Sequence, residues 1–100
     1  RDAGAKSVHL MISSPPVRFP DFYGINTPDQ KELIASYKNH KEIEKEIRVD
    51  SLYYLSYKGL VKAVGIAESK LCTACFTGEY PIDIGEKKLE INYHPAYAKI

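Results

Sequence analysis

Two cysteines, Cys72 and Cys75, stand three residues apart and are the only cysteines in the 100-residue chain. Such a C-x-x-C pair can ligate a metal, carry out redox chemistry, close a local disulfide or simply pack. The chain lacks the second pair that a zinc ribbon needs. Gly78 and Pro81 indicate a loop rather than the helix of a thioredoxin-type site. Two thiolates make half a metal site, and Asp21 is one candidate for a further ligand.

The other reactive side chains form no catalytic motif. Ser13 and Ser14 follow an apolar run, where a strand end could place an active site, but no nucleophile-elbow motif surrounds them. The sequence also lacks a glycine-rich phosphate loop. We interpret the serines as turn residues and the histidines as surface or core residues. The three histidines are His9, His40 and His94.

Charge and hydropathy argue against several classes of function. Fourteen basic and 13 acidic residues give a net charge of +1, which offers no electrostatic reason to bind nucleic acid or an anionic membrane. No apolar run approaches the roughly 20 residues that span a bilayer, and the first residues do not resemble a signal peptide. We therefore expect a cytoplasmic protein that binds neither nucleic acid nor membrane.

The N-terminal part is typical of the end of an α/β layer. Alternating apolar residues predict a strand over Val8–Ile12, which Pro15 and Pro16 end because proline cannot donate to a sheet. Arg1–Ala3 is interpreted as the last turn of a helix, with Gly4 as its left-handed stop. Since the helix itself is missing, we expect the chain to be a piece of a longer protein.

Capping signals predict the elements that follow. Thr27, Pro28 and Gln30 form a capping box, Asn39 begins a second helix, and Ser56 a third. The expected elements are helices over Asp29–Tyr37, His40–Arg48 and Tyr57–Val64, and a strand over Ser51–Leu55. Near the C-terminus, Leu89, Ile91 and Tyr93 alternate with polar residues, a pattern compatible with a terminal strand.

Periodicity predicts which positions of these helices are buried. We expect Ile43 and Ile47 to face inward while Glu44 and Arg48 form an ion pair one helical turn apart. In the third helix the expected buried positions are Leu60, Val61 and Val64.

Three stretches, taken together, resemble one known family. They are AGAKSVHLMISSPPVRFPDFYGINTPDQKELIA, DSLYYLSYKGLVKAV and CTACFTGEYP. In the same order and with similar spacing they resemble the C-terminal part of glutamine phosphoribosylpyrophosphate (PRPP) amidotransferases, which make phosphoribosylamine in the first committed step of purine biosynthesis. The resemblance covers residues 1 to about 82 and is far more specific than any single motif.

The resemblance implies an α/β fragment that is inactive alone. In the family a glutaminase domain releases ammonia, and a phosphoribosyltransferase domain with Mg²⁺ uses it to displace pyrophosphate from PRPP. The catalytic residues and the Mg²⁺ site lie outside this chain. We expect residues 1–26 to end the parallel-sheet transferase domain, 27–82 to form a helical C-terminal cap of about three short helices with the C-x-x-C loop, and 83–100 to form a tail.

The resemblance also implies partners: the remaining glutaminase and PRPP-binding parts of the same enzyme, and further copies in a homo-oligomer. The alternative is a stand-alone metal-binding or protein-interaction module.

Site residues follow from the resemblance as well. Many family members bind a structural 4Fe–4S cluster through four cysteines, two of which match Cys72 and Cys75. A third lies where this chain has Asp21, a harder and weaker ligand, and the fourth lies upstream. The main alternative is a disulfide between Cys72 and Cys75. Leu33 matches a leucine that lines the family's ammonia channel, and its alternative role is an ordinary core residue.

Overall fold

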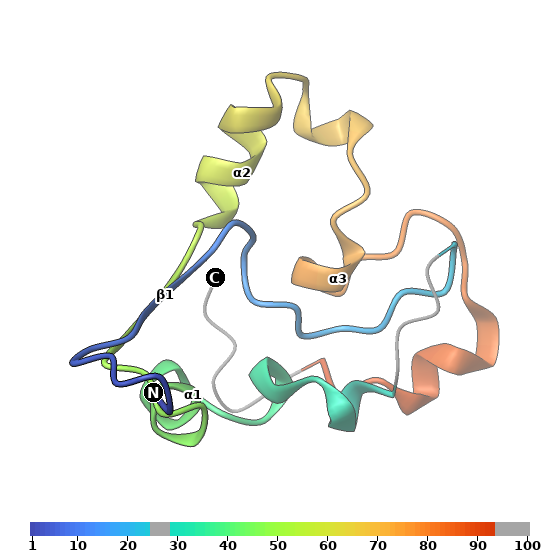
Figure 1. The fold of residues 1–100 in the computed structure, drawn as a ribbon. Helices are drawn as coiled ribbons and strands as arrows, with labels where there is room; N and C mark the ends of the chain where they lie inside the picture. Colours follow the sequence, from blue (N-terminus) through green and yellow to red (C-terminus); the bar gives the residue numbers. More distant parts are fainter. Residues whose placement is uncertain (25–28, 94–100) are drawn as a thin grey trace.

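The fold has a small parallel sheet at one side and short helices along the rest of the chain (Figure 1). The structure is a computed structural model that describes residues 1–24 and 29–93. The strands are β1 (His9–Ile12) and β2 (Ser51–Tyr54), and the α-helices are α1 (His40–Glu46), α2 (Tyr57–Val64) and α3 (Ala74–Thr77). The 3₁₀ turns are η1 (Gln30–Glu32), η2 (Ile34–Ser36), η3 (Glu68–Lys70) and η4 (Gly85–Glu90). None of the helices in the described residues is long and apolar enough to cross a membrane.

The two strands pair in parallel, with Leu10 opposite Leu52 and Ile12 opposite Tyr54. A parallel pair cannot be joined by a tight hairpin, so the chain between the strands must leave the sheet and return. That crossover contains the first loop, η1, η2 and α1. β1 lies within the strand predicted over Val8–Ile12, and β2 within the strand predicted over Ser51–Leu55.

The core lies on the inner face of this sheet. Leu52 is 1% exposed and packs with the buried side chains of Ala35 and Ile43. Four partly buried apolar residues surround this cluster: Ile12, Ile34, Val49 and Tyr54. The crossover therefore folds its helical elements back over one face of the strands.

The outer face of the sheet carries exposed side chains. Met11 and Tyr53 are register partners, and they are 80% and 62% exposed. Beside them, His9 Nδ1 lies 2.7 Å from Ser51 Oγ. Parallel sheets are normally covered on both faces, so this face is unusual for its class.

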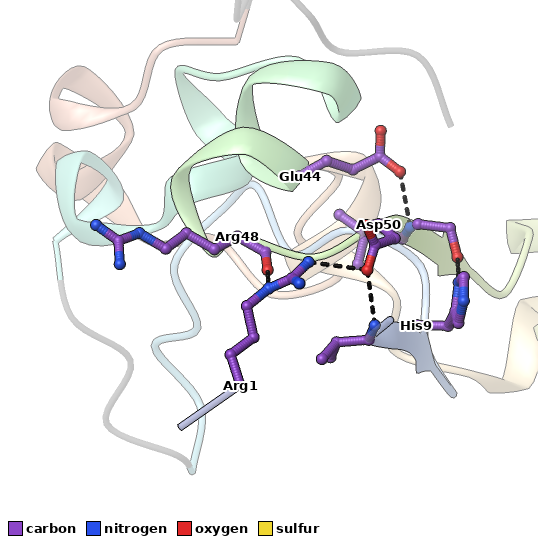
Figure 2. A network of polar contacts seen from close by, with 8 residues as sticks. Arg1, His9, Glu44, Arg48 and Asp50 are labelled. Carbon is purple, nitrogen blue, oxygen red and sulfur yellow. Dashed lines mark hydrogen bonds and ion pairs between the residues drawn. The ribbon is translucent and has the colours of Figure 1, made fainter. Parts of the chain in front are cut away.

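A polar network joins the starts of the two strands (Figure 2). The Asp50 carboxylate accepts from the Val8 N–H at 2.7 Å and pairs with Arg1 Nη2 at 2.8 Å. These two contacts, the Val8 amide first, lower the pKa of Asp50. Arg1 Nε also donates to the Arg48 carbonyl at 2.8 Å, and Glu44 accepts from the Leu52 N–H at 2.8 Å. The network thus ties the beginning of the chain to the loop that enters β2.

Helix ends set by local signals are confirmed. Asn39 begins α1 as expected, and it forms a capping box with Glu42. Ser56 caps α2 by accepting from the Gly59 N–H, and Gly65 ends that helix at a φ of 78°. Gly4 is also left-handed, with a φ of 92°, and its N–H donates to the Arg1 carbonyl at 2.9 Å.

The helix predicted over Asp29–Tyr37 is wrong: the segment forms the two 3₁₀ turns η1 and η2, with Leu33 extended between them. The Ser36 hydroxyl donates to the carbonyls of Gln30 and Leu33 at 2.6 and 2.7 Å, which favours the tighter turns. The Gln30 side chain bonds distant backbone instead of closing a capping box. The rest of that box, residues 27 and 28, lies outside the described residues.

The expected pair of Glu44 and Arg48 is also wrong, because α1 ends at Glu46 and Arg48 adopts a left-handed φ of 58°. Glu44 instead pairs with Lys41 at 3.2 Å. Three further predictions fail: Ile47 and Val64 are 40% and 48% exposed, and the tail forms η4 rather than a strand.

We predict that the isolated 100-residue chain self-associates through the outer face, because Met11 and Tyr53 expose apolar surface beside a strand edge. Met11→Lys should shift sedimentation toward monomer by adding charge there. Leu89→Lys, at a side chain that is 87% exposed in the tail, is the matched control and should leave association unchanged. A compact wild-type monomer that unfolds cooperatively would contradict this prediction.

Candidate functional site

The loop after β1 lies along the C-x-x-C segment, as Figure 1 shows for α3 and the blue chain. The amides of Arg18 and Phe19 both donate to the Cys75 carbonyl, at 3.0 and 3.1 Å. These two bonds bring together two of the stretches that carry the family resemblance. The candidate site is therefore a tertiary feature, assembled from residues far apart in sequence.

Gly78 makes this close approach possible. It ends α3 at a φ of 77°, a conformation that side chains rarely tolerate. A Cβ at Gly78 would lie 3.0 Å from the Phe19 ring. Both the backbone angle and the packing therefore require glycine here.

Aromatic residues extend the contact beyond α3. The Tyr80 hydroxyl donates to the Pro20 carbonyl at 2.7 Å. The Tyr80 ring centroid lies 5.6 Å from that of Phe22 and 6.1 Å from that of Tyr23. Burial raises the pKa of Tyr80, so its hydroxyl stays protonated and available as a donor.

The two cysteines differ in their surroundings. Both thiols are free, with Cys72 exposed and Cys75 half-buried. Contrary to the loop expected from the sequence, Cys75 lies within the single turn of α3, which Thr73 precedes as N-cap. Gly78 does end this helix, but one turn after it begins.

The electrostatics of Cys75 disfavour a reactive thiolate. Burial raises the pKa of its thiol, and the nearby acidic groups of Asp21 and Cys72 raise it further. Reactive cysteines need the opposite environment, an electropositive one that lowers the pKa. The thiol of Cys75 is therefore held in its protonated form, whereas a bound cation would favour its thiolate.

Asp21 lies close enough to influence Cys75, but the ligand set for a metal is incomplete. Its Oδ1 accepts from the Tyr23 N–H at 2.7 Å in a local turn. Within residues 1–24 and 29–93, no group of three or more His, Cys, Asp or Glu side chains is arranged to hold a metal ion. A 4Fe–4S cluster needs four ligands, so the described residues fit it only in part.

The other candidate residues lie apart from this site. Leu33 is half-buried between η1 and η2. His9 contacts Ser51 on the outer face of the sheet, and His40 Nε2 lies 3.8 Å from Glu44. Ser14 donates to the Pro15 carbonyl at 3.0 Å. His94 lies outside the described residues.

Sequence reasoning missed the groups that connect the site to the tail. Tyr23 and Gln30 each bond backbone groups about sixty positions later, at Ile82 and Asn92. No periodicity or capping rule links such distant positions. The available signal was that Tyr23 and Gln30 both lie in the first stretch that carries the family resemblance.

Comparisons with known proteins agree with this arrangement of motifs. The chain is 52% identical over 87 residues to an amidophosphoribosyltransferase of Synechococcus elongatus. The glutamine PRPP amidotransferase of B. subtilis, solved with ADP and GMP, superposes with a TM-score of 0.77 at 48% identity over 86% of this chain. The structure of an allosteric regulatory enzyme of purine biosynthesis superposes with a TM-score of 0.78 at 44% identity over 90% of the chain. No family model matches the sequence.

The chain matches the C-terminal part of amidophosphoribosyltransferases. It spans 18% of the Synechococcus relative and 20% of the B. subtilis structure. The predicted family resemblance and the α/β fragment are thereby confirmed. The residues that hold α3 against the first loop lie within the part of the chain that is similar to these amidophosphoribosyltransferases.

We predict that Gly78→Ala loosens α3 from the first loop more than the same change does at Gly65. Both glycines are left-handed, which costs an alanine about 1–2 kcal/mol, but Gly65 has open space where Gly78 faces Phe19. The clash should add about 1–3 kcal/mol. Hydrogen exchange of the Phe19 amide in the longer protein measures the difference. Equal exchange in the two variants would contradict it.

Proposed function

We propose that this chain is the C-terminal segment of an enzyme that makes 5-phosphoribosylamine from PRPP and glutamine, at the start of purine biosynthesis. The supporting observation is the combined match in sequence and fold: 52% identity over 87 residues to one named amidophosphoribosyltransferase, and a TM-score of 0.77 to a glutamine PRPP amidotransferase. Similarity at this level extends through the C-x-x-C segment and the loop that packs on it.

The proposed role of the segment is structural and connecting, rather than catalytic. Residues 1–26 would complete the parallel sheet of the phosphoribosyltransferase domain, 27–82 would cap it, and 83–100 would form the tail. The glutaminase, the PRPP site and the Mg²⁺ site would lie in the remainder of the longer protein. That enzyme would act in the cytoplasm as an assembly of identical subunits. Parallel sheets are normally covered on both faces, and the outer face of this one is exposed. This exposure supports the proposal that another part of the longer protein covers it.

We further propose that Cys72 and Cys75 ligate an iron–sulfur cluster, with Asp21 as a third ligand. The support is the setting of Cys75: burial raises the pKa of its thiol, nearby Asp21 and Cys72 raise it further, and a bound cation would favour the thiolate instead. Any remaining ligand would come from the rest of the longer protein. When bound, such a cluster supplies a structural cross-link, and no catalytic step is assigned to it.

The alternative function, a stand-alone metal-binding module, is less well supported. The described residues do not bring together a group of three or more His, Cys, Asp or Glu side chains that could hold a metal ion. The outer sheet face would also remain exposed in such a module.

The enzyme proposal is tested with the longer protein encoded by the same reading frame. We expect it to release pyrophosphate from PRPP with either glutamine or free ammonia as nitrogen donor. If Leu33 lines an ammonia channel, Leu33→Ala should lower glutamine-dependent turnover several-fold and spare ammonia-dependent turnover. Ile34→Ala, next to the core, is the control and should lower both together through stability. A reading frame that begins near Arg1, or a protein inactive with both donors, would contradict the proposal.

The cluster proposal predicts a brown protein after anaerobic purification of the longer enzyme. Cys72→Ser or Cys75→Ser should remove colour and iron. Asp21→Asn should weaken iron binding, since an amide is a poorer donor, and Asp21→Cys should strengthen it with a thiolate. Thr73→Ser, between the cysteines, is the matched control and should keep the colour.

A disulfide between Cys72 and Cys75 predicts the opposite outcome: a colourless, iron-free protein that gains two thiols on reduction. For so small a ring the chain-entropy model allows only about 2 kcal/mol of stabilisation or less. Iron-free protein from iron-replete anaerobic cells would end the cluster proposal and leave the enzyme proposal intact.

A further inference from the structure

The tail from residue 82 to 93 runs back across the loop that follows β1. Figure 1 shows this red and orange segment passing along the blue chain below α3. The segment contains η4, whose 3₁₀ turns are intrinsically weak. Its position must therefore depend mainly on its contacts with the rest of the protein.

Two polar anchors hold the ends of this segment. At one end, the Tyr23 hydroxyl donates to the Ile82 carbonyl at 2.6 Å and accepts from the Ile82 N–H at 3.1 Å. At the other, Gln30 Nε2 donates to the Asn92 carbonyl at 3.0 Å while Gln30 Oε1 accepts from the Asn92 N–H at 2.7 Å. In each case one side chain satisfies both backbone groups of a tail residue, as a neighbouring strand would.

Apolar and charged contacts lie between and beside these anchors. Ile91 is 9% exposed and so is buried within the contact. The Lys87 ammonium lies 5.4 Å from the centroid of the Phe22 ring. The Tyr93 and Phe19 ring centroids lie 6.0 Å apart. By contrast, Leu89 is 87% exposed and contributes little burial.

The same loop residues hold α3 in place. Phe19 contacts Tyr93 through its ring and donates its N–H to the Cys75 carbonyl. Tyr93 also lines a cavity together with Gly78 and Tyr80, directly after the helix that carries Cys75. The loop is thus sandwiched between the tail and the cysteine helix.

We propose that residues 82–93 are a strap that clamps residues 17–23 against α3 and thereby limits access to the Cys75 thiol. The strap has few buried apolar side chains, so it can release without global unfolding. Its release would loosen the two amide bonds to the Cys75 carbonyl and expose the half-buried thiol. This inference goes beyond the proposed enzyme and needs neither iron nor activity.

The test compares two serine substitutions on the strap, Ile91→Ser and Leu89→Ser, in the longer protein. The two changes are chemically matched, but only Ile91 is buried. Ile91→Ser should speed hydrogen exchange in residues 86–93 about tenfold or more, the factor expected from losing one buried aliphatic side chain. Release of the strap should also loosen residues 17–23. Hydrogen exchange at the Arg18 and Phe19 amides should therefore become faster in the same variant. Leu89→Ser should change neither.

Alkylation by iodoacetamide after chelator treatment gives the second readout, with peptide mass spectrometry distinguishing the two cysteines. Ile91→Ser should increase labelling of Cys75 several-fold, while exposed Cys72 labels rapidly in every variant. Ile91→Ala should also increase the labelling of Cys75, but by a smaller factor. If the serine variant fails to fold, the alanine variant still tests the proposal. Faster exchange in the tail with unchanged Arg18, Phe19 and Cys75 would overturn the strap.

Discussion

The parallel pairing of β1 with β2 is the constraint on which the rest of the structure depends. Because parallel strands need a long crossover, their pairing closes the whole stretch from residue 13 to 50 into one loop. The register places Leu52 opposite Leu10, and Leu52 becomes the most buried apolar side chain of the core. Asp50, bonded to the Val8 amide, fixes where this pairing begins. The helical part of the crossover, η2 and α1, packs over the inner face through Ala35 and Ile43.

The closed crossover in turn presents residues 17–23 to the cysteine helix. Backbone amides of Arg18 and Phe19 meet a single carbonyl, that of Cys75, and Gly78 leaves room for the Phe19 ring. Burial at this point raises the pKa of Cys75, and the charges of nearby Asp21 and Cys72 raise it further. Packing thus makes it unfavourable to ionise the Cys75 thiol, and a bound cation would remove this penalty.

Sequence patterns correctly predicted those helix ends that depend on interactions between residues close together in the chain. The caps at Asn39 and Ser56 and the stop at Gly65 depend on groups within a few residues, and all three are confirmed. The helix over Asp29–Tyr37 failed because Ser36 and Gln30 make other bonds, one of them to the distant tail. The surroundings of Cys75 depend on Phe19 and Asp21, which no local rule connects to it. The resemblance brought these motifs together where periodicity could not.

Burial predictions failed in a way that has its own physical meaning. Val64 and Ile47 stand at positions where amphipathic spacing predicts a buried face, yet they are 48% and 40% exposed. Met11 lies in a strand of a parallel sheet, a class normally covered on both faces, yet it is 80% exposed. An amphipathic pattern is selected for the surface that covers it in the whole protein, and this chain spans only about a fifth of the B. subtilis structure that it matches. The pattern is therefore consistent with the proposed longer enzyme, in which these side chains would find their partners. In the segment alone, hydrophobic spacing and the burial of side chains must disagree wherever the partner lies in another part of the protein.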